Sequence, residues 1–261
     1  MFMYVVYFLV FLFSCLLGAI VGLGGGVIIR PVLDAIGYHN VMNIAFFTSS
    51  AIIIMSVVST SQKKAKGGAN IQISTAVLIS LGALVGGALG DLLLQFLIGL
   101  FRYESTMQMI QAITNIIVLT SAIYFTSSER FRFELKAKWL YPVLGLLLGA
   151  VAMLLGIAGG PVNVPVFMVL FSMSAKNAAA YSIVVIFFAH LLRLVNMGIT
   201  PGFASFDLSF LLATLPAAAI GGAAGAMISR KMTDKSVTKA FNITMVGLVG
   251  LNIFNIVTFM G

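Results

Sequence analysis

The sequence predicts an all-α membrane protein, a polytopic bundle of helices that crosses the bilayer several times. Of its 261 residues, 61% are hydrophobic and only 8% are charged, whereas a soluble domain carries about 25% charged residues. Long apolar segments recur along the whole chain, separated by short gaps that hold most of the charge. This pattern is typical of stacked transmembrane helices, so we expect a multi-pass protein of the cell membrane.

Charges and Gly/Pro clusters divide the chain into apolar segments. They lie near residues 2–23, 27–36, 44–61, 71–100, 107–125, 139–157, 162–172, 177–197, 208–228 and 240–260. A helix needs roughly 20 residues to cross the hydrocarbon core, and residues 27–36 and 162–172 are too few. Because each of these short segments follows a glycine cluster, we expect each to be a half-helix that begins inside the membrane.

The glycine clusters also mark an internal repeat. Residues 22–32 read GLGGGVIIRPV, and residues 156–166 read GIAGGPVNVPV at an offset of 134 positions. The register continues beyond the clusters, and with one inserted residue the glycines of residues 86–90 fall on those of residues 221–225. The chain is therefore interpreted as two homologous halves.

The loop charges predict that the two halves have opposite orientations. Residues 61–70 hold three lysines and no acid, whereas their counterpart, residues 200–205, holds no charge. The next loop reverses this, because residues 101–106 hold one arginine and one glutamate, and their counterpart, residues 230–239, holds four basic residues and one acid. By the positive-inside rule, we expect two inverted repeats with both chain ends outside. Their bounds are residues 1–125 and 139–261, with a cytoplasmic linker at 126–138.

An inverted half must cross the membrane an odd number of times, yet each half has four long apolar segments and a short one. If residues 2–23 and 27–36 enter and return on the same side, and residues 139–157 and 162–172 do likewise, each half crosses three times. Residues 2–23 are long enough to span fully. Both arrangements of these segments therefore stay open at this point.

The two glycine clusters are the leading candidates for a binding site. An unpaired backbone amide in hydrocarbon costs several kcal/mol, so an interrupted helix must face protein or a polar cavity. The free N–H groups at the start of a half-helix carry about half a positive charge. Two such ends aimed at one midplane point would suit an anion. The candidate residues are Gly24, Gly25, Gly26, Gly159 and Gly160. Tight helix packing is the alternative role of glycine, and four-residue spacing favours it for Gly82, Gly86, Gly90, Gly221, Gly222 and Gly225.

Polar side chains near the clusters are further candidates. Hydrogen-bond donors without charge are Asn43, Thr48, Ser49, Asn163, Asn177 and Ser182, although a hydroxyl in a helix can instead bond back to its own backbone. Arg30 and Arg193 are candidates because an arginine inside a span costs at least about 2.5 kcal/mol and needs a partner or a wet cavity. Snorkelling to headgroups is their alternative. For His190, a packed and hydrogen-bonded side chain is favoured over a proton relay.

The paired motifs GLGGGVIIRPV and GIAGGPVNVPV resemble those of the TauE/SafE sulfite exporter family, and the resemblance extends over essentially the whole chain. It implies a secondary transporter that moves sulfite, sulfonates or related sulfur-containing anions. The two inverted halves predict alternating access about a midplane site, driven by protons or another coupling ion. Ala158 stands where the first motif has a glycine, and Arg30 stands where the second has Val164. Exact two-fold symmetry of the site is therefore not expected.

Other function classes fit the sequence less well. A passive anion channel is the alternative that shares broken helices, but it would normally show a continuous polar lining. The two histidines and one cysteine lack the spacing of an enzymatic or metal site, so neither an enzyme nor a cofactor is expected. A nucleotide-binding loop is absent from the sequence. The net charge of +8 lies in short loops beside apolar segments, which argues for the lipid bilayer as partner rather than nucleic acid.

Overall fold

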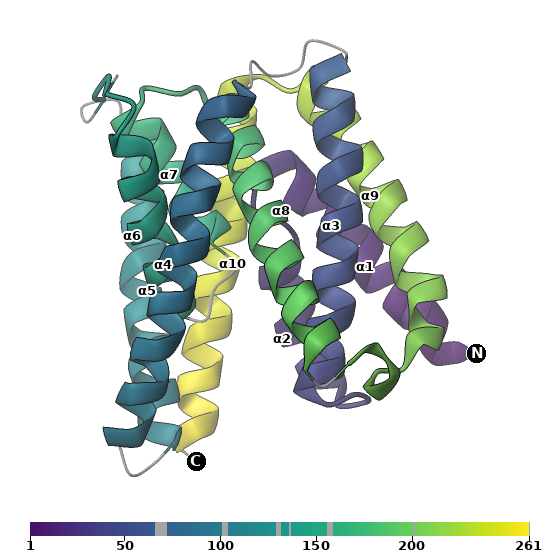
Figure 1. Ribbon diagram of the computed structural model, residues 1–261. Helices are drawn as coiled ribbons and strands as arrows, with labels where there is room; N and C mark the ends of the chain where they lie inside the picture. Colours follow the sequence, from purple (N-terminus) through teal and green to yellow (C-terminus); the bar gives the residue numbers. More distant parts are fainter. Residues whose placement is uncertain are drawn as a thin grey trace.

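A computed structural model shows a bundle of long helices (Figure 1). The structure describes residues 1–65, 72–100, 104–128, 132–135, 137–155, 159–200 and 202–260. The helices are α1 (Phe2–Val21), α2 (Gly26–Ile36), α3 (Val41–Ala65), α4 (Ile73–Leu100), α5 (Glu104–Ser127), α6 (Leu140–Leu154), α7 (Gly160–Leu170), α8 (Ala175–Ile199), α9 (Leu211–Lys231) and α10 (Asp234–Met260), with short 3-10 turns η1 (Phe203–Ser205) and η2 (Leu208–Phe210) before α9.

The helices confirm the predicted fold class. In the described part of the chain every element is helical. Among the described residues, seven helices are long and apolar enough to cross a membrane: α1, α3, α4, α5, α8, α9 and α10. The apolar helices α6 and α7 are shorter, and α2 has 11 residues. A multi-pass, all-helical membrane protein follows from these lengths.

Both predicted interruptions are present. The chain leaves α1 at Gly22 and enters α2 after Gly25, and it enters α7 after Gly159. Gly22, Gly24, Gly25 and Gly159 have φ values of 84°, 79°, 74° and 73°, a left-handed conformation that glycine adopts without steric cost. Gly22, Gly24 and Gly25 therefore turn the backbone between α1 and α2, and Gly159 turns it into α7. Gly156 and Ala158 of the second motif lie outside the described residues.

The helix bounds follow the sequence repeat. Helices α2 and α7 begin and end 134 positions apart, and so do α3 and α8. In Figure 1, α3 ends at the top of the view, where α9 also ends, whereas α8 ends at the bottom. Helices α3 and α8 therefore run in opposite directions through the bundle.

Glycines bring two pairs of helices into backbone contact. A Cβ atom on Gly86 of α4 would meet the carbonyl group of Leu146 on α6, and one on Gly221 of α9 would lie 2.5 Å from the carbonyl oxygen of Leu12 on α1. Gly82 and Gly90 meet α6 in the same way, Gly225 meets α1, and Gly222 lies against Met55 of α3. The packing role predicted for these glycines is confirmed.

A pair of neighbouring glycines tests this packing. Gly86→Ala is expected to lower the free energy of unfolding by about 1–3 kcal/mol, because the added methyl group pushes α6 away. Gly87→Ala is the control, since a Cβ there meets nothing within 4 Å and alanine favours a helix by up to about 1 kcal/mol. Reversible unfolding in mixed detergent micelles measures both. Equal stability of the two variants would contradict the packing role.

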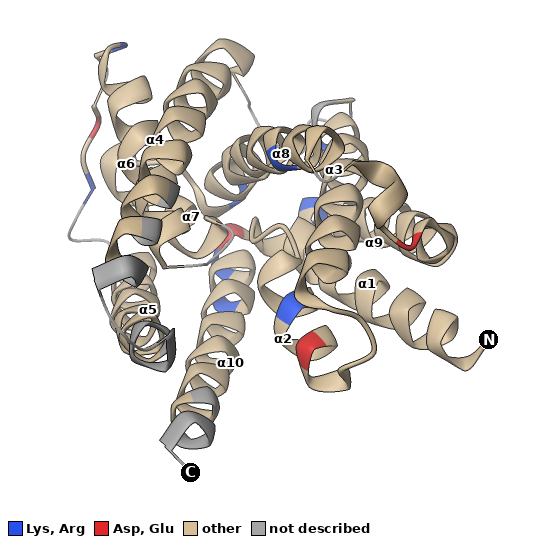
Figure 2. Ribbon diagram, turned by 60° about the horizontal axis from the view of Figure 1, so that its bottom comes forward, with Lys and Arg blue, Asp and Glu red and all other residues tan. Residues whose placement is uncertain are grey.

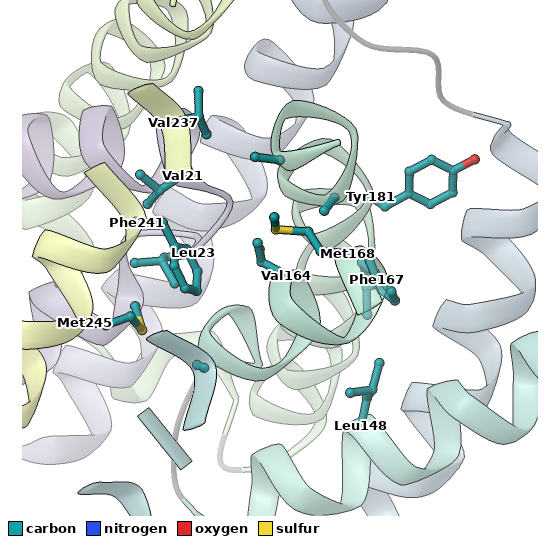
Figure 3. Close-up of a cluster of buried hydrophobic side chains, with 14 of the residues drawn as sticks. Val21, Leu23, Leu148, Val164, Phe167, Met168, Tyr181, Val237, Phe241 and Met245 are labelled. Atoms are coloured by element: carbon teal, nitrogen blue, oxygen red, sulfur yellow. The ribbon is translucent and has the colours of Figure 1, made fainter. Parts of the chain in front are cut away.

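A buried apolar cluster joins the two halves. Figure 3 shows side chains from the end of α1, from α7 and from α10 grouped together. They include Val21, Leu23, Val164, Phe167, Met168, Phe241 and Met245. The segment that leaves α1 in the first half is thus packed among helices of the second half.

Candidate functional site

The two helix interruptions meet inside the bundle. A Cβ atom on Gly160, the first residue of α7, would lie 2.5 Å from Cα and 2.8 Å from the carbonyl oxygen of Leu23, which follows α1. A Cβ atom on Gly24 would lie 3.0 Å from the side chain of Ile186 on α8, a helix of 25 residues. Ile186 is roughly 16 Å from the start of that helix at 1.5 Å per residue. The meeting point therefore lies deep in the bundle.

Side chains from three other helices bond to the free carbonyl groups at the end of α1. An interrupted helix leaves these groups without partners in the helix itself. The pairs are Lys63 Nζ to Ala19 O at 2.8 Å, Ser182 Oγ to Gly22 O at 2.7 Å, and Ser229 Oγ to Ile20 O at 3.4 Å. All three donors are buried. The ammonium group of Lys63 also lies at the negative end of the helix dipole, which favours a cation.

The end of α6 is bonded differently. The amide of Gln111 on α5 donates to Leu154 O at 2.8 Å, and the amide of Asn115 donates to Leu155 O at 3.1 Å. The carbonyl end of α6 is therefore held by neutral amides, whereas that of α1 is held by a cation and two hydroxyl groups. The site lacks exact two-fold symmetry.

No side chain of the described residues caps the amino-terminal ends of the short helices α2 and α7. The N-cap positions of α2 and α7 are occupied by Gly25 and Gly159. At neither position does a side chain accept a hydrogen bond from the first turn. A glycine cap has no side-chain oxygen to accept from the amides of the first turn. In α7, Pro161 has no N–H group and the amides of Val162 and Asn163 donate to Gly159 O, and in α2 the amides of Ile28 and Ile29 donate to Gly25 O. The first-turn N–H groups left for an acceptor are therefore that of Gly160 in α7 and those of Gly26 and Val27 in α2.

Two of the predicted polar side chains lie at the interruptions, and a third is the repeat counterpart of one of them. Ser182 bonds to Gly22, as given above, and a Cβ atom on Gly159 would lie 3.2 Å from the amide nitrogen of Asn163, which is buried. Thr48 is the repeat counterpart of Ser182 and is buried as well. Its hydroxyl oxygen has no partner among the described residues.

Thr48 is one of several buried residues whose hydroxyl oxygen has no hydrogen-bond partner among the described residues. In the part of the chain that the structure describes, the hydroxyl oxygens of Ser56, Ser59 and Thr214 also lack a partner. Thr48, Ser56 and Ser59 lie on α3, and Thr214 lies on α9, which packs against α3. Sequence reasoning singles out neither Ser56 nor Thr214, because a lone hydroxyl in an apolar helix carries no signal of its neighbours.

Ser49 and His190 form a pair between the two halves. The hydroxyl oxygen of Ser49 and Nδ1 of His190 are 3.1 Å apart, and both residues are buried. His190 therefore has the packed, hydrogen-bonded arrangement expected of it.

The other predicted residues are not brought to the interruptions. Arg30 is exposed and its Nε lies 3.7 Å from the carboxylate of Asp34, and Arg193 is exposed on α8. Asn43 lies in the first turn of α3, where its side-chain oxygen accepts from the backbone amide of Asp207 at 3.1 Å. Asn177 lies in the first turn of α8.

A second polar cluster lies at the end of the bundle where α2 ends and α9 begins. The hydroxyl group of Tyr7 is 2.7 Å from Nδ1 of His39, and Nε2 of His39 is 3.6 Å from the carboxylate of Asp207. The hydroxyl group of Ser209 donates to that carboxylate and is the main cause that holds the pKa of Asp207 below its ordinary value. This cluster ties α1 to the loops before α3 and α9.

Interrupted helices that meet in the middle of a multi-pass bundle are typical of membrane transporters. The model of the sulfite exporter TauE/SafE family matches residues 7–253, and the chain belongs to this family. The chain is similar to the probable membrane transporter protein YunE of Bacillus subtilis (strain 168), with 33% identity over 107 residues. That match covers 41% of this chain and 38% of the relative. No solved structure matches the chain.

Proposed function

We propose that the protein is a secondary transporter of sulfur-containing anions, such as sulfite or sulfonates, and that it works by alternating access. The contact between Gly160 and Leu23 carries this proposal, because it brings both interrupted helices to one buried point. Family membership supports the anion class. A gradient of protons or another ion drives the cycle.

In this proposal the transport unit is a pair of inverted repeats, residues 1–125 and 139–261, joined by the linker at 126–138. The equal helix bounds and the opposite directions of α3 and α8 support it. The charges agree, since Arg230, Lys231, Lys235 and Lys239 surround the junction of α9 and α10. Figure 2 shows the basic residues of α10 far from the C-terminus. By the positive-inside rule, this junction and the linker lie in the cytoplasm.

The pairs α1–α2 and α6–α7 are then re-entrant, each entering the membrane and returning on one side. Helix α6 has 15 residues and α7 has 11, so neither is long enough to span at 1.5 Å per residue. Helix α1 is long enough, but its last residues lie beside the middle of the bundle, where the backbone turns at Gly22.

The proposed anion site combines backbone amides with neutral side chains. Its donors are Gly24, Gly25, Gly26, Thr48, Gly159, Gly160 and Asn163. Ser182, whose hydroxyl group donates to Gly22 O, holds the turn beside them. Hydrogen bonds to an ionised acceptor are roughly twice as strong as neutral ones, so these donors suffice to hold an oxyanion. Because the amides have no net charge, the anion is released without separating a buried ion pair.

A passive channel is the competing function, and the packing argues against it. The meeting point is enclosed by buried apolar side chains of α7 and α10 (Figure 3). An open pore needs a continuous polar lining, whereas alternating access closes one side of the site at a time.

Counterflow in proteoliposomes tests the proposal. Vesicles are loaded with unlabelled sulfite, thiosulfate, taurine, sulfoacetate or acetate, and entry of the same solute in labelled form is followed at trace concentration. We expect saturable entry of at least one sulfur-containing anion, accelerated by internal substrate, and none for acetate. Entry that does not saturate and does not respond to internal substrate would identify a channel, and no entry of any sulfur-containing anion would refute the proposal.

A further inference from the structure

A cleft at the proposed cytoplasmic end of the bundle has the composition of an anion site. Its volume is about 960 Å³, within the range of roughly 300–1,000 Å³ that is typical of ligand sites. It lies between the end of α5, the linker, the α7–α8 junction and the first turns of α10. Gly160 and the other residues of the proposed transport site do not line it.

The charges that line the cleft are mostly positive. They come from Arg132, Lys235 and Lys239, against the single acid Asp234. One carboxylate oxygen of Asp234 accepts from the backbone amide of Lys176 at 3.0 Å. In the described part of the chain, no carboxylate lies within 4 Å of the three basic side chains. An anion in the cleft therefore meets cations that have no carboxylate partner among the described residues.

Arg132 is held in place for such a ligand. The backbone amides of Phe133 and Leu135 donate to the carbonyl groups of Val169 and Leu170 at 2.7 Å and 3.1 Å, which fixes the linker against the end of α7. One guanidinium nitrogen of Arg132, Nη1, is buried and has no hydrogen-bond partner among the described residues. A buried donor of a charged group without an acceptor is unfavourable, and an oxyanion would satisfy it.

Neutral polar groups complete one wall. The hydroxyl group of Thr126 donates to the side-chain oxygen of Asn242 at 2.7 Å, and the amide of Asn242 donates to the hydroxyl oxygen of Ser127 at 2.9 Å. This chain of bonds joins α5 to α10 and leaves the hydroxyl group of Ser127 free to donate into the cleft.

We propose that this cleft is a second anion site, which binds a sulfate, sulfonate or phosphate group through Arg132, Lys235 and Lys239. The group belongs either to a small soluble anion or to the headgroup of an anionic lipid in the cytoplasmic leaflet. The proposal does not depend on the transport function proposed above, because none of the cleft residues belongs to the site between the interruptions.

Binding to the purified protein in nanodiscs tests the proposal. In phosphatidylcholine discs, sulfate and inorganic phosphate are titrated at constant ionic strength by calorimetry. In mixed discs, retention of phosphatidylglycerol is measured by native mass spectrometry. We expect Arg132→Gln and Lys239→Gln each to lower the affinity for one of these ligands about tenfold or more. Lys231→Gln removes the same charge at the same end but does not line the cleft, and we expect it to change binding less than about twofold.

The two arms identify the source of the bound group. Soluble anions that bind in phosphatidylcholine discs support a small-anion site, and phosphatidylglycerol retention that only the cleft variants lose supports a headgroup site. A Gly160→Ala protein should still bind the ligand of the cleft, which separates this site from the transport site. Absence of both ligands, or binding that Arg132→Gln and Lys239→Gln leave at the level of Lys231→Gln, would overturn the proposal.

Discussion

Gly160→Ala is expected to reduce transport about a hundredfold while the protein still inserts in the membrane. The added Cβ would lie 2.5 Å and 2.9 Å from the Cα and carbonyl carbon of Leu23, and backbone atoms cannot move aside as a flexible side chain can. Gly160 itself has ordinary helical backbone geometry, so alanine causes no local strain. The two interruptions must instead separate by roughly 1 Å, a displacement that in active sites is enough to lose about a hundredfold in rate.

Initial rates of counterflow, normalised to the amount of reconstituted protein, measure this effect. Gly247→Ala on α10 is the matched control, because a Cβ there meets nothing within 4 Å, and it should transport like the parent protein. Size-exclusion profiles show whether Gly160→Ala is folded. A folded Gly160→Ala protein with the parental rate would show that contact between the interruptions is not needed for transport.

Ser182→Ala is expected to lower the free energy of unfolding by about 1–3 kcal/mol, because it leaves a buried carbonyl group without its donor. The hydroxyl group of Ser182 bonds to Gly22 O across the boundary between the halves. The carbonyl group of Gly22 belongs to a left-handed turn rather than to the interior of a helix. Transport should fall as well, since the turn at Gly22 is then free to shift.

Ser80→Ala is the control for this substitution. Ser80 is also a buried serine in a long helix, but its hydroxyl group donates to Ala76 O in its own helix at 2.7 Å. That carbonyl group keeps a backbone partner when the hydroxyl group is removed, so we expect a change of less than about 0.5 kcal/mol. Unfolding in mixed micelles compares the two variants. Equal losses of unfolding free energy in the two variants would mean that the hydrogen bond to Gly22 O stabilises the protein no more than the hydroxyl group of any buried serine.

The helices were predictable because bilayer thickness and glycine each impose a strong local rule. The sequence places the short helices at residues 27–36 and 162–172, and the structure has α2 at Gly26–Ile36 and α7 at Gly160–Leu170. The interruptions were predictable because each glycine cluster is followed by an apolar segment too short to span, and glycine adopts the positive φ values found at Gly24, Gly25 and Gly159 without steric cost.

The side chains around the interruptions were less predictable because their role depends on a neighbour in space. Ser182 and Ser80 look alike in the sequence, and only the turn at Gly22 distinguishes them. Lys63 is counted with the loop charges from the sequence, but α3 continues to Ala65, and the ammonium group is buried against Ala19. Its partner, a carbonyl group freed by the end of α1, is created only by the fold.

Arg30 differs from Ser182 and Lys63, because its partner in the structure is close to it in the sequence. Asp34 follows it by four residues, a spacing that pairs opposite charges on one helix face, and the structure has this pair at 3.7 Å. The cost of an arginine in the membrane predicts a partner for it, and Asp34 is one such partner. A role of Arg30 in anion binding stays a prediction.

Because Leu23 and Gly160 are in contact, hydrogen exchange at the glycine segments measures separation of the two halves. Solvent deuterium reaches the backbone amides of Gly24, Gly25 and Gly160 only after the surfaces around them part. The exchange rate at these few positions therefore counts how often the two halves separate, and it does so in the unlabelled protein without any added probe.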